Sequence, residues 1–343
     1  MSELTHIIEQ TANGVFADNV SQKMLEAFEK GEVDKTLLQT IDEAGLTKVL
    51  LPENEGGAGG SWLDAEVVLR ASGRHRVPAP VGEAIAAYWL LSKASLPIPS
   101  EGVVTWAPAI EKGDTLVVAK APWVCVADHI LLWSDQGHFY LFDSLDGLDQ
   151  WKNMAAEPRG TGTIEKSKAI ASAQVPQDLQ ALGAQSLGAL LRAVQMSGAL
   201  DGALHIAVNY ATERVQFGRP ISKFQAIQQQ LALMAGHVAT AVRAAGAGCE
   251  AIERDPATAG FDIATAKVRN GEAVEISTSV AHQVHAAIGI TFEYGLNFYS
   301  RRLWSWRDEF GSESYWAEEI GRAAIELGGA GLWSAITENT LSL

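Results

Sequence analysis

A break between two helical patterns carries an unusual set of side chains. The stretch from Tyr210 to Ala235, YATERVQFGRPISKFQAIQQQLALMA, reads as a helix, a turn that Gly and Pro enforce, and a second helix. The turn presents Arg214, Phe217 and Gln225 where an ordinary helix end would carry solvating Lys and Glu. Taken alone, these residues suit either an ordinary exposed surface or a tip that binds a ligand.

The charge balance of the chain limits which ligands such a tip could bind. The 343 residues carry a formal net charge of -15, with a pI near 5.0. Non-specific nucleic-acid binding depends on neutralising phosphates with Lys and Arg, so this composition disfavours a nucleic-acid partner. Any phosphate-bearing ligand would need a local basic site.

Other residue types that do chemistry lack the required spacing. The helical stretches hold four histidines without an H-E-x-x-H pattern, so no metal site is expected: His205, His237, His282 and His285. Cys125 and Cys249 lie far apart without flanking His or Cys, which is typical of buried free thiols. No G-x-S-x-G elbow and no strand-to-helix G-x-G-x-x-G occur, so neither a hydrolase nor a Rossmann dinucleotide site is indicated.

Length and hydropathy indicate a globular protein of several units. Single cores rarely grow beyond ~250 residues, so two or three packed units are expected. Hydrophobic residues make up 47% and charged residues 20% of the sequence, and no window approaches the ~20 apolar residues of a membrane span. The start, MSELTHIIEQ, contains acidic residues and no basic region before an apolar core. A cytoplasmic location is therefore expected.

The periodicity of the sequence changes twice. Residues 4–96 predict helices, interrupted by a Gly-rich turn from Leu50 to Trp62, which we interpret as a tight connection or, less favourably, a phosphate cradle. Residues 102–176 are rich in β-branched and aromatic residues and predict five to seven short strands in a small barrel or sandwich. Long helical patterns follow and suit an antiparallel four-helix bundle. The sequence thus predicts an α+β fold with domains at 1–101, 102–176 and 177–343.

The C-terminal helical block also predicts self-association. The helix from Leu187 to Ala207 is rich in small residues, which let neighbouring backbones approach closely. Four tryptophans near the C-terminus are typical of core or interface anchors: Trp304, Trp306, Trp316 and Trp333. Because large apolar faces usually mark interfaces, we expect a dimer or a larger assembly such as a tetramer.

Three segments resemble the acyl-CoA dehydrogenase family. ATERVQFGRPISKFQAIQQQLALM is similar to the family signature R-x-x-FG-x-x-[IL]-x-x-x-QA-[IV]-x-x-x-[LI]-A-x-M. AHQVHAAIGITFEYGLNFYSRRLWSW resembles the block Q-[VIL]-[HFL]-GG-x-G-[FY]-[TS] followed by an arginine-rich helix, and LLPENEGGAGGSWLDAEVVLRASGR resembles the PEEYGG-G turn and helix. Helical, β and helical blocks occur in the family order, so the resemblance spans nearly the whole chain.

The resemblance implies a flavoprotein that binds FAD and dehydrogenates acyl-CoA thioesters. In the family, the C-terminal hairpin tip reaches across a dimer interface to the FAD of the neighbouring subunit. Arg214 would then neutralise the diphosphate, Phe217 would face the cofactor, and Gln225 would contact the nucleotide half. Gln283 and the backbone from Val284 to Ala287 would contact the same region. The resemblance further implies an electron-transferring flavoprotein as acceptor and a homo- or heterotetramer.

Two cofactor segments depart from the family pattern. Ala286 and Ala287 stand where the family has Gly-Gly, and an added methyl obstructs close approach of backbone N–H groups to a diphosphate. The family's TEP-and-GSD-like loop, which hydrogen-bonds the flavin ring and lines the thioester site, is not recognisable. TWAPAI, from Thr105 to Ile110, stands where that loop would begin.

The catalytic base of the family is also displaced or missing. The family's chemistry needs a Glu that removes the α-proton of the thioester while hydride moves from the β-carbon to the flavin. At one family position for this base, the turn DEFGSES puts Phe310 in the place of Glu, with Glu309 one residue earlier. A second position used in some members falls roughly at Gly188. Glu309 is therefore the candidate catalytic residue, as a shifted base or a merely solvated carboxylate.

Three functions are compatible with this pattern. The chain could be a self-sufficient FAD-dependent acyl-CoA dehydrogenase, a base-less partner subunit that completes the FAD site of a catalytic paralogue in a heterotetramer, or a same-fold acyl-CoA oxidase. A reactive base near the flavin separates the first from the second. Electron transfer to O2 in place of a flavoprotein acceptor separates the third.

Overall fold

The computed structural model describes residues 2–292, 294–337 and 343, and these divide into two compact units. The first unit extends to Val68 and also contains Val77–Leu187 and Asp255–Ala257. The second contains Leu69–Arg76, Gly188–Arg254 and the residues from Thr258 onward. The predicted domain boundaries at 101/102 and 176/177 remain predictions.

The first unit opens with helices, and the first three of them begin at side-chain caps. They are α1 (Glu3–Asn19), α2 (Gln22–Glu29), α3 (Lys35–Glu43), α4 (Trp62–Arg74), whose last turns belong to the second unit, and α5 (Val81–Lys93). Ser2, Ser21 and Asp34 cap the first three by accepting hydrogen bonds from the backbone N–H three residues later. α5 is buried on nearly every side, which explains its lack of an amphipathic pattern.

The Gly-rich turn before α4 is a tight connection. The short 3-10 turn η1 (Leu46–Lys48) precedes this connection, and a second one, η2 (Glu53–Glu55), lies within it. The N–H of Gly59 donates to the carbonyl of Leu51 at 2.8 Å, and that of Gly60 donates to Val49 at 2.9 Å. Because these donors bond within the loop, they are not presented to a phosphate.

Residues 104–174 form seven strands in one continuous series of pairings. The strands are β1 (Val104–Lys112), β2 (Thr115–Pro122), β3 (His129–Ser134), β4 (His138–Phe142), β5 (Asp149–Lys152), β6 (Pro158–Glu165) and β7 (Ala171–Gln174). Their order is β5-β6-β2-β1-β3-β4-β7. β1 belongs to two ladders: residues 104–109 pair with β3 and residues 110–112 pair with β2. Hairpins alone do not explain this arrangement, because β1 and β3 run parallel.

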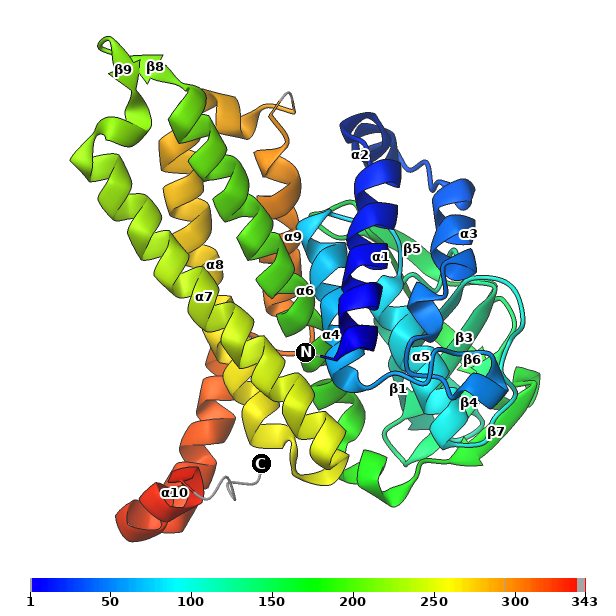
Figure 1. The fold of residues 1–343 in the computed structure, drawn as a ribbon. Helices are drawn as coiled ribbons and strands as arrows, with labels where there is room; N and C mark the ends of the chain where they lie inside the picture. Colours follow the sequence, from blue (N-terminus) through cyan, green and yellow to red (C-terminus); the bar gives the residue numbers. More distant parts are fainter. Residues whose placement is uncertain (1, 293, 338–342) are drawn as a thin grey trace. The chain divides into compact units, whose positions relative to one another are not determined.

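The second unit is built on a bundle of four long helices, which lie side by side in Figure 1. They are α6 (Gln177–Glu213), which has a non-helical break at Gly183 and belongs to the first unit up to Leu187, α7 (Gln225–Arg254), α8 (Gly260–His285) and α9 (Leu296–Asp308). α10 (Glu313–Thr337) follows and contacts α8. Side chains of the four bundle helices share one buried apolar core. The expected α+β fold with a C-terminal bundle is confirmed.

Small residues in α6 allow the close packing that the sequence suggested. A Cβ added at Gly198 would collide with the carbonyl oxygen of Arg70, and one added at Gly202 would lie 2.5 Å from the Tyr299 ring.

In the described part of the chain, no helix is long and apolar enough to cross a membrane. The same residues contain no cluster of three or more metal-ligating side chains.

Candidate active site

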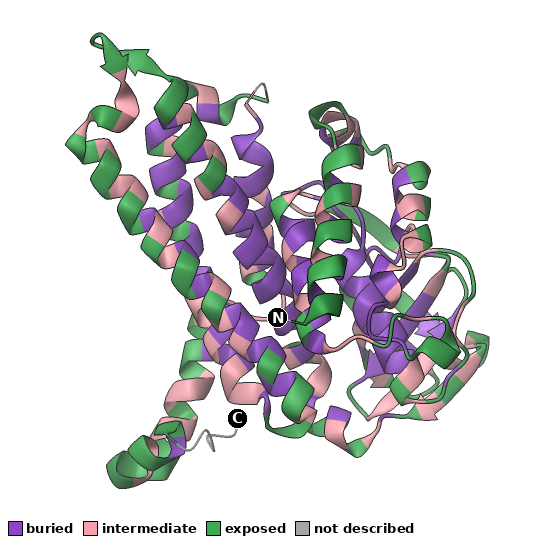
Figure 2. Cartoon of the chain, in the orientation of Figure 1, coloured by how far each residue is buried: buried purple, intermediate pink, exposed green. Residues whose placement is uncertain are grey.

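The tip predicted between the two helices is a short β-hairpin with a two-residue turn. β8 (Val215–Gln216) pairs with β9 (Arg219–Pro220), and the turn between them puts Phe217 at φ 52 and Gly218 at φ 79. A tight hairpin turn with two left-handed residues favours Gly at both positions, so Phe217 is held in a costly conformation. Its side chain is 93% exposed, and residues 215–219 of the hairpin are all exposed (Figure 2). A strained, exposed aromatic ring is a feature of contact sites.

The tip also presents cations and an amide to solvent. Arg214 is exposed, and its side chain has no ion pair or hydrogen bond with a described residue. Arg219 lies over the ring of Phe224 at 4.3 Å, and that ring contacts Phe217 edge to face. Gln225 is exposed at the first residue of α7. These contacts fix the shape of the tip while leaving Arg214 accessible to an anion.

The second family segment lies at the same end of the bundle as the hairpin (Figure 1). Tyr210, one turn before the hairpin, stacks on His285 at 4.6 Å between ring centroids, and Tyr294 packs against both rings. Burial lowers the pKa of His285, and its Nδ1 bonds the carbonyl of Ala281 at 2.7 Å. The aromatic cluster of Tyr210, His285 and Tyr294 therefore ties the two cofactor segments together.

The backbone after α8 keeps the shape of a glycine segment although it holds alanines. Gln283 and Ala287 are exposed and Val284 is buried. Ala286 adopts φ 53 and ψ -141, a region that suits glycine and costs an alanine of order 1–3 kcal/mol. The 3-10 turn η6 (Ala286–Ile290) follows. The segment thus adopts a glycine-like conformation at Ala286 at the expense of strain.

These observations test whether FAD fits the chain. The donor set suits a dinucleotide diphosphate, because an accessible guanidinium, an exposed aromatic ring and an exposed amide stand at one tip. The exposed, glycine-like backbone at Ala286 is compatible with the same ligand. The tip therefore fits the nucleotide and diphosphate part of FAD.

The two predicted base positions meet in space, and neither carries an acid. Phe310 follows α9 in a left-handed conformation, φ 56, and its ring packs directly on Gly188 of α6. A Cβ added at Gly188 would lie well inside van der Waals contact with three atoms of that ring. The neighbouring residues of α6, from Leu187 to Leu191, are all apolar or glycine. An aromatic ring therefore fills the space between the two predicted base positions.

Glu309 lies beside this position in a buried ion pair. Its Oε2 accepts a hydrogen bond from Nε of Arg192 at 2.6 Å, and the Arg192 side chain is 2% exposed. Arg192 also donates to Gln195 at 2.5 Å and lies over the Trp306 and Phe310 rings. Sequence reasoning missed Arg192, although a single cation in an otherwise apolar helix segment was the available signal.

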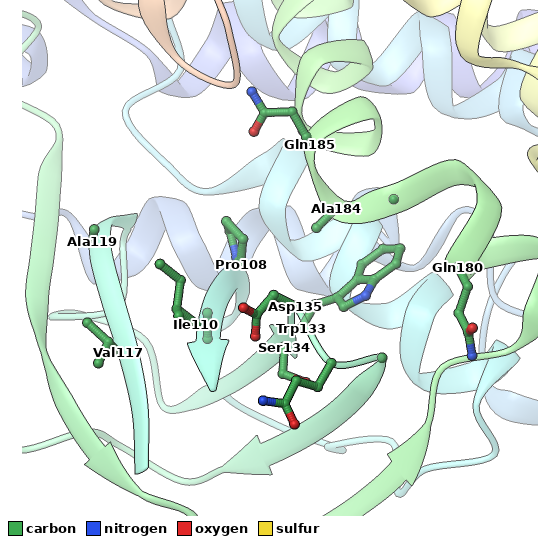
Figure 3. A pocket seen from close by; sticks show the side chains of 14 residues that line it. Pro108, Ile110, Val117, Ala119, Trp133, Ser134, Asp135, Gln180, Ala184 and Gln185 are labelled. Atoms are coloured by element: carbon green, nitrogen blue, oxygen red, sulfur yellow. The ribbon is translucent and has the colours of Figure 1, made fainter. Parts of the chain in front are cut away.

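The segment where the resemblance places the flavin-ring loop is a strand. TWAPAI lies inside β1, and β1 returns to β2 through Gly113 and Asp114 alone. Part of β1 instead lines a cavity of about 700 Å³ (Figure 3). The Asp135 and Gln180 side chains on its wall bond to backbone groups at 2.8 and 2.6 Å. Among the described residues on that wall there is no Lys or Arg, so the cavity offers no cation to CoA phosphates.

Comparison with known proteins agrees with this architecture. The sequence profile of the acyl-CoA dehydrogenase N-terminal domain matches residues 2–94, and that of the acyl-CoA dehydrogenase C-terminal domain matches residues 180–325. Together they cover well over half of the chain. The chain belongs to the acyl-CoA dehydrogenase family, a class of FAD-dependent oxidoreductases that act on acyl-CoA thioesters. The expected family, cofactor and class of substrate are confirmed.

Individual relatives extend over most of the chain. Acyl-CoA dehydrogenase IpdE2 of Mycolicibacterium smegmatis is 29% identical over 312 residues, which are 88% of this chain and 93% of that protein. Among solved structures, the ChsE4-ChsE5 complex from Mycobacterium tuberculosis aligns with a TM-score of 0.80 at 20% identity, over 95% of this chain and 98% of that chain. Glutaryl-coenzyme A dehydrogenase aligns at 0.75 and 19% identity, over 96% and 97%. These structures share the fold.

Proposed function

We propose that this chain is the base-less subunit of a heteromeric acyl-CoA dehydrogenase, which completes the FAD site of a catalytic paralogue. The observation that carries the proposal is the packing of Phe310 on Gly188, because it fills both base positions with groups that cannot accept a proton. The reaction needs a carboxylate that removes the α-proton, and loss of a general base costs about 10²–10⁴-fold in rate. Efficient turnover then depends on a Glu of another chain.

Glu309 does not serve as the base in this proposal. Its Oε2 accepts a hydrogen bond from Arg192, and a proton taken up by Glu309 would neutralise the carboxylate and weaken that ion pair. Opening it would leave the buried guanidinium of Arg192 without its carboxylate, which is costly. We therefore assign Glu309 to the support of the turn that carries Phe310.

The hairpin tip contributes to cofactor binding. Arg214 neutralises the diphosphate, Phe217 supplies an apolar face, and Gln225 bonds the nucleotide half. Gln283, Val284 and the backbone at Ala287 form the second contact segment. When bound, FAD accepts the hydride from the β-carbon of the acyl thioester. The residues of this chain hold and orient that cofactor, while the flavin ring and the thioester lie against the sheet of the partner.

The short connection between β1 and β2 also supports a partner subunit that binds the flavin ring. Because β1 returns to β2 in a two-residue turn, this connection holds no loop that could hydrogen-bond the flavin ring. The cavity beside β1 presents no cation among its described residues. Each flavin ring would therefore need the sheet of a partner subunit. The fold likeness to a chain of the ChsE4-ChsE5 complex is consistent with a heteromeric assembly.

Three finer assignments belong to this proposal. Electrons leave the flavin to an electron-transferring flavoprotein, the assembly is a heterotetramer, and the complex works in the cytoplasm. A self-sufficient dehydrogenase and an acyl-CoA oxidase are the rival functions, and no feature of the described residues favours O2 as the acceptor.

The test is an activity assay of the chain purified alone. Acyl-CoA thioesters of different acyl groups are offered together with an artificial electron acceptor, for the parent and for Glu309→Gln. We expect at most a residual rate that Glu309→Gln leaves unchanged. Robust turnover by the parent, abolished by Glu309→Gln, would make the chain a complete dehydrogenase with a displaced base.

A further inference from the structure

A single lysine is buried beneath the turn that carries Phe310. Lys267 of α8 has no exposed surface, although lysine is rarely buried without partners. Its Nζ donates to three backbone carbonyls, those of Trp306 at 3.2 Å, Arg307 at 2.7 Å and Gly311 at 2.6 Å. All three protons of the ammonium therefore have acceptors.

These carbonyls need an outside donor. Trp306 and Arg307 lie in the last turn of α9, where carbonyl groups lack a partner within the helix and favour a positive charge. The chain then reverses through Phe310 at φ 56 and Gly311 at φ 91, two consecutive left-handed residues. Such a conformation persists only where the surroundings hold it. The ammonium joins the end of α9 to the far side of the turn.

Further contacts support the turn, and one of them is the ion pair between Arg307 of α9 and Glu313 of α10, in which Nε of Arg307 donates to Oε2 of Glu313 at 2.9 Å. Nε1 of Trp316 donates to the carbonyl of Phe310 at 2.9 Å, and Arg192 holds the carboxylate of Glu309. Residues 309, 310 and 311 are thus each fixed by a different partner. Among these partners Lys267 alone bonds backbone carbonyls on both sides of the turn.

We propose that Lys267 is the positioning residue of the turn formed by residues 309–311. By bonding this turn it holds residue 310 over residue 188, so the chain retains the framework for a catalytic base although it lacks the carboxylate. This inference rests on the proposed function for the identity of position 310 as a base position. The contacts of Lys267 themselves do not depend on it. A partner that carries Glu at the equivalent position would need the same support.

The charge of Lys267 makes the support sensitive to pH. Burial lowers the pKa of Lys267 to about 7; the nearby Glu309, Glu313 and Asp308 carboxylates raise it and the Arg192 guanidinium lowers it. A neutral amine has only two protons to donate, so one of the three carbonyls would lose its partner as the pH rises through this range. The turn should therefore loosen in mildly alkaline solution.

The experiment compares amide hydrogen exchange at residues 309–311 in the parent, Lys267→Met and the control Lys23→Met. Methionine keeps the length and apolar stem of Lys267, and Lys23 is an exposed lysine of α2. We expect exchange at these amides to quicken by about 10- to 100-fold in Lys267→Met, as befits hydrogen bonds from a charged donor. Lys23→Met should match the parent. Unchanged protection in a folded Lys267→Met would overturn the proposal.

A pH titration of the parent provides a second measurement that needs no variant. Trp306 and Trp316 flank the turn, so their fluorescence reports its state. We expect the signal to change with a midpoint near pH 7 and the protection of residues 309–311, corrected for intrinsic exchange, to fall above it. The transition should vanish in Lys267→Met, whereas one that persists there belongs to another group and contradicts the assignment. Neither readout depends on whether the chain is active, so failure here and failure of the proposed function are distinguishable.

Discussion

Adding a methyl group at Gly188 should expel the Phe310 ring. A Cβ at that position would overlap the Cγ, Cδ1 and Cε1 atoms of the ring, whereas carbon atoms in good contact lie about 3.5–4.0 Å apart. Phe310 is half-buried and held by Trp316 through its carbonyl, so the ring must rotate out or the turn must shift. Overpacking of this kind costs about 1–3 kcal/mol.

A double-mutant cycle isolates this contact. Phe310→Ala removes a half-buried ring and should cost about 1–3 kcal/mol, less than the 3–5 typical of fully buried phenylalanines. In that background the methyl of Gly188→Ala meets no ring, so its own cost should disappear. We therefore expect the double variant to be more stable than the sum of the single effects by about 1–3 kcal/mol. Independent sites would add within about 0.3–0.5 kcal/mol.

Urea unfolding followed by tryptophan fluorescence measures the cycle. A change in midpoint at constant slope reports a change in the free energy of unfolding. The control is Gly14→Ala in α1, because an added Cβ there meets nothing within 4 Å and should be neutral or stabilising. If Gly188→Ala behaves like Gly14→Ala, or if the cycle is additive, Phe310 does not fill the space above Gly188.

Other parts of the site give further expectations. Ala286→Gly should raise the free energy of unfolding by about 1 kcal/mol, because it relieves a left-handed alanine; a loss of stability in urea would show that the methyl makes a needed contact. Arg214→Ala should lower the flavin content of the flavin-containing assembly without changing its far-UV circular dichroism. Replacement of Arg243, an exposed cation of α7, by Ala should leave the flavin content unchanged. Equal flavin content in both variants would contradict the assignment of Arg214 to the diphosphate. The pKa of His285 is lowered by burial, so below about pH 6.5 the unfolded chain binds a proton that the folded chain does not, and stability falls as pH falls. His285→Phe keeps a ring against Tyr210 and should reduce that fall, and an unchanged pH dependence of unfolding would assign it to other groups. The purified protein should sediment as a dimer or larger, and a stable 36.7 kDa monomer at micromolar concentration would contradict the expected association.

The order of structural blocks could be predicted because it depends on local patterns. Hydrophobic periods of 3.6 and 2 separate helices from strands, and Gly and Pro mark the hairpin at Phe217 to Pro220. The parallel pairing of β1 with β3 could not, because the hydrogen bonds join segments separated by β2 and no local signal encodes that choice. Propensity identifies strands, whereas tertiary packing decides their neighbours.

The candidate site shows the same limit. The residues of the tip could be found, since Arg214, Phe217 and Gln225 lie in one short motif. Phe310 and Gly188 are in contact although they lie far apart in the sequence, and no local pattern near either residue predicts this contact. Lys267 was equally hidden, because a lysine in a helix is normally solvated and its burial depends on the carbonyls that α9 presents.

Native mass spectrometry of the assembly formed by this chain in its own cell tests the central claim most directly. A tagged chain is isolated with its partners, and the number of each polypeptide and of bound FAD molecules is counted. We expect a heteromer that contains a related acyl-CoA dehydrogenase chain, with one flavin for each partner chain and none held on the sheet of this chain. A homo-oligomer with one FAD for every copy of this chain would contradict the account.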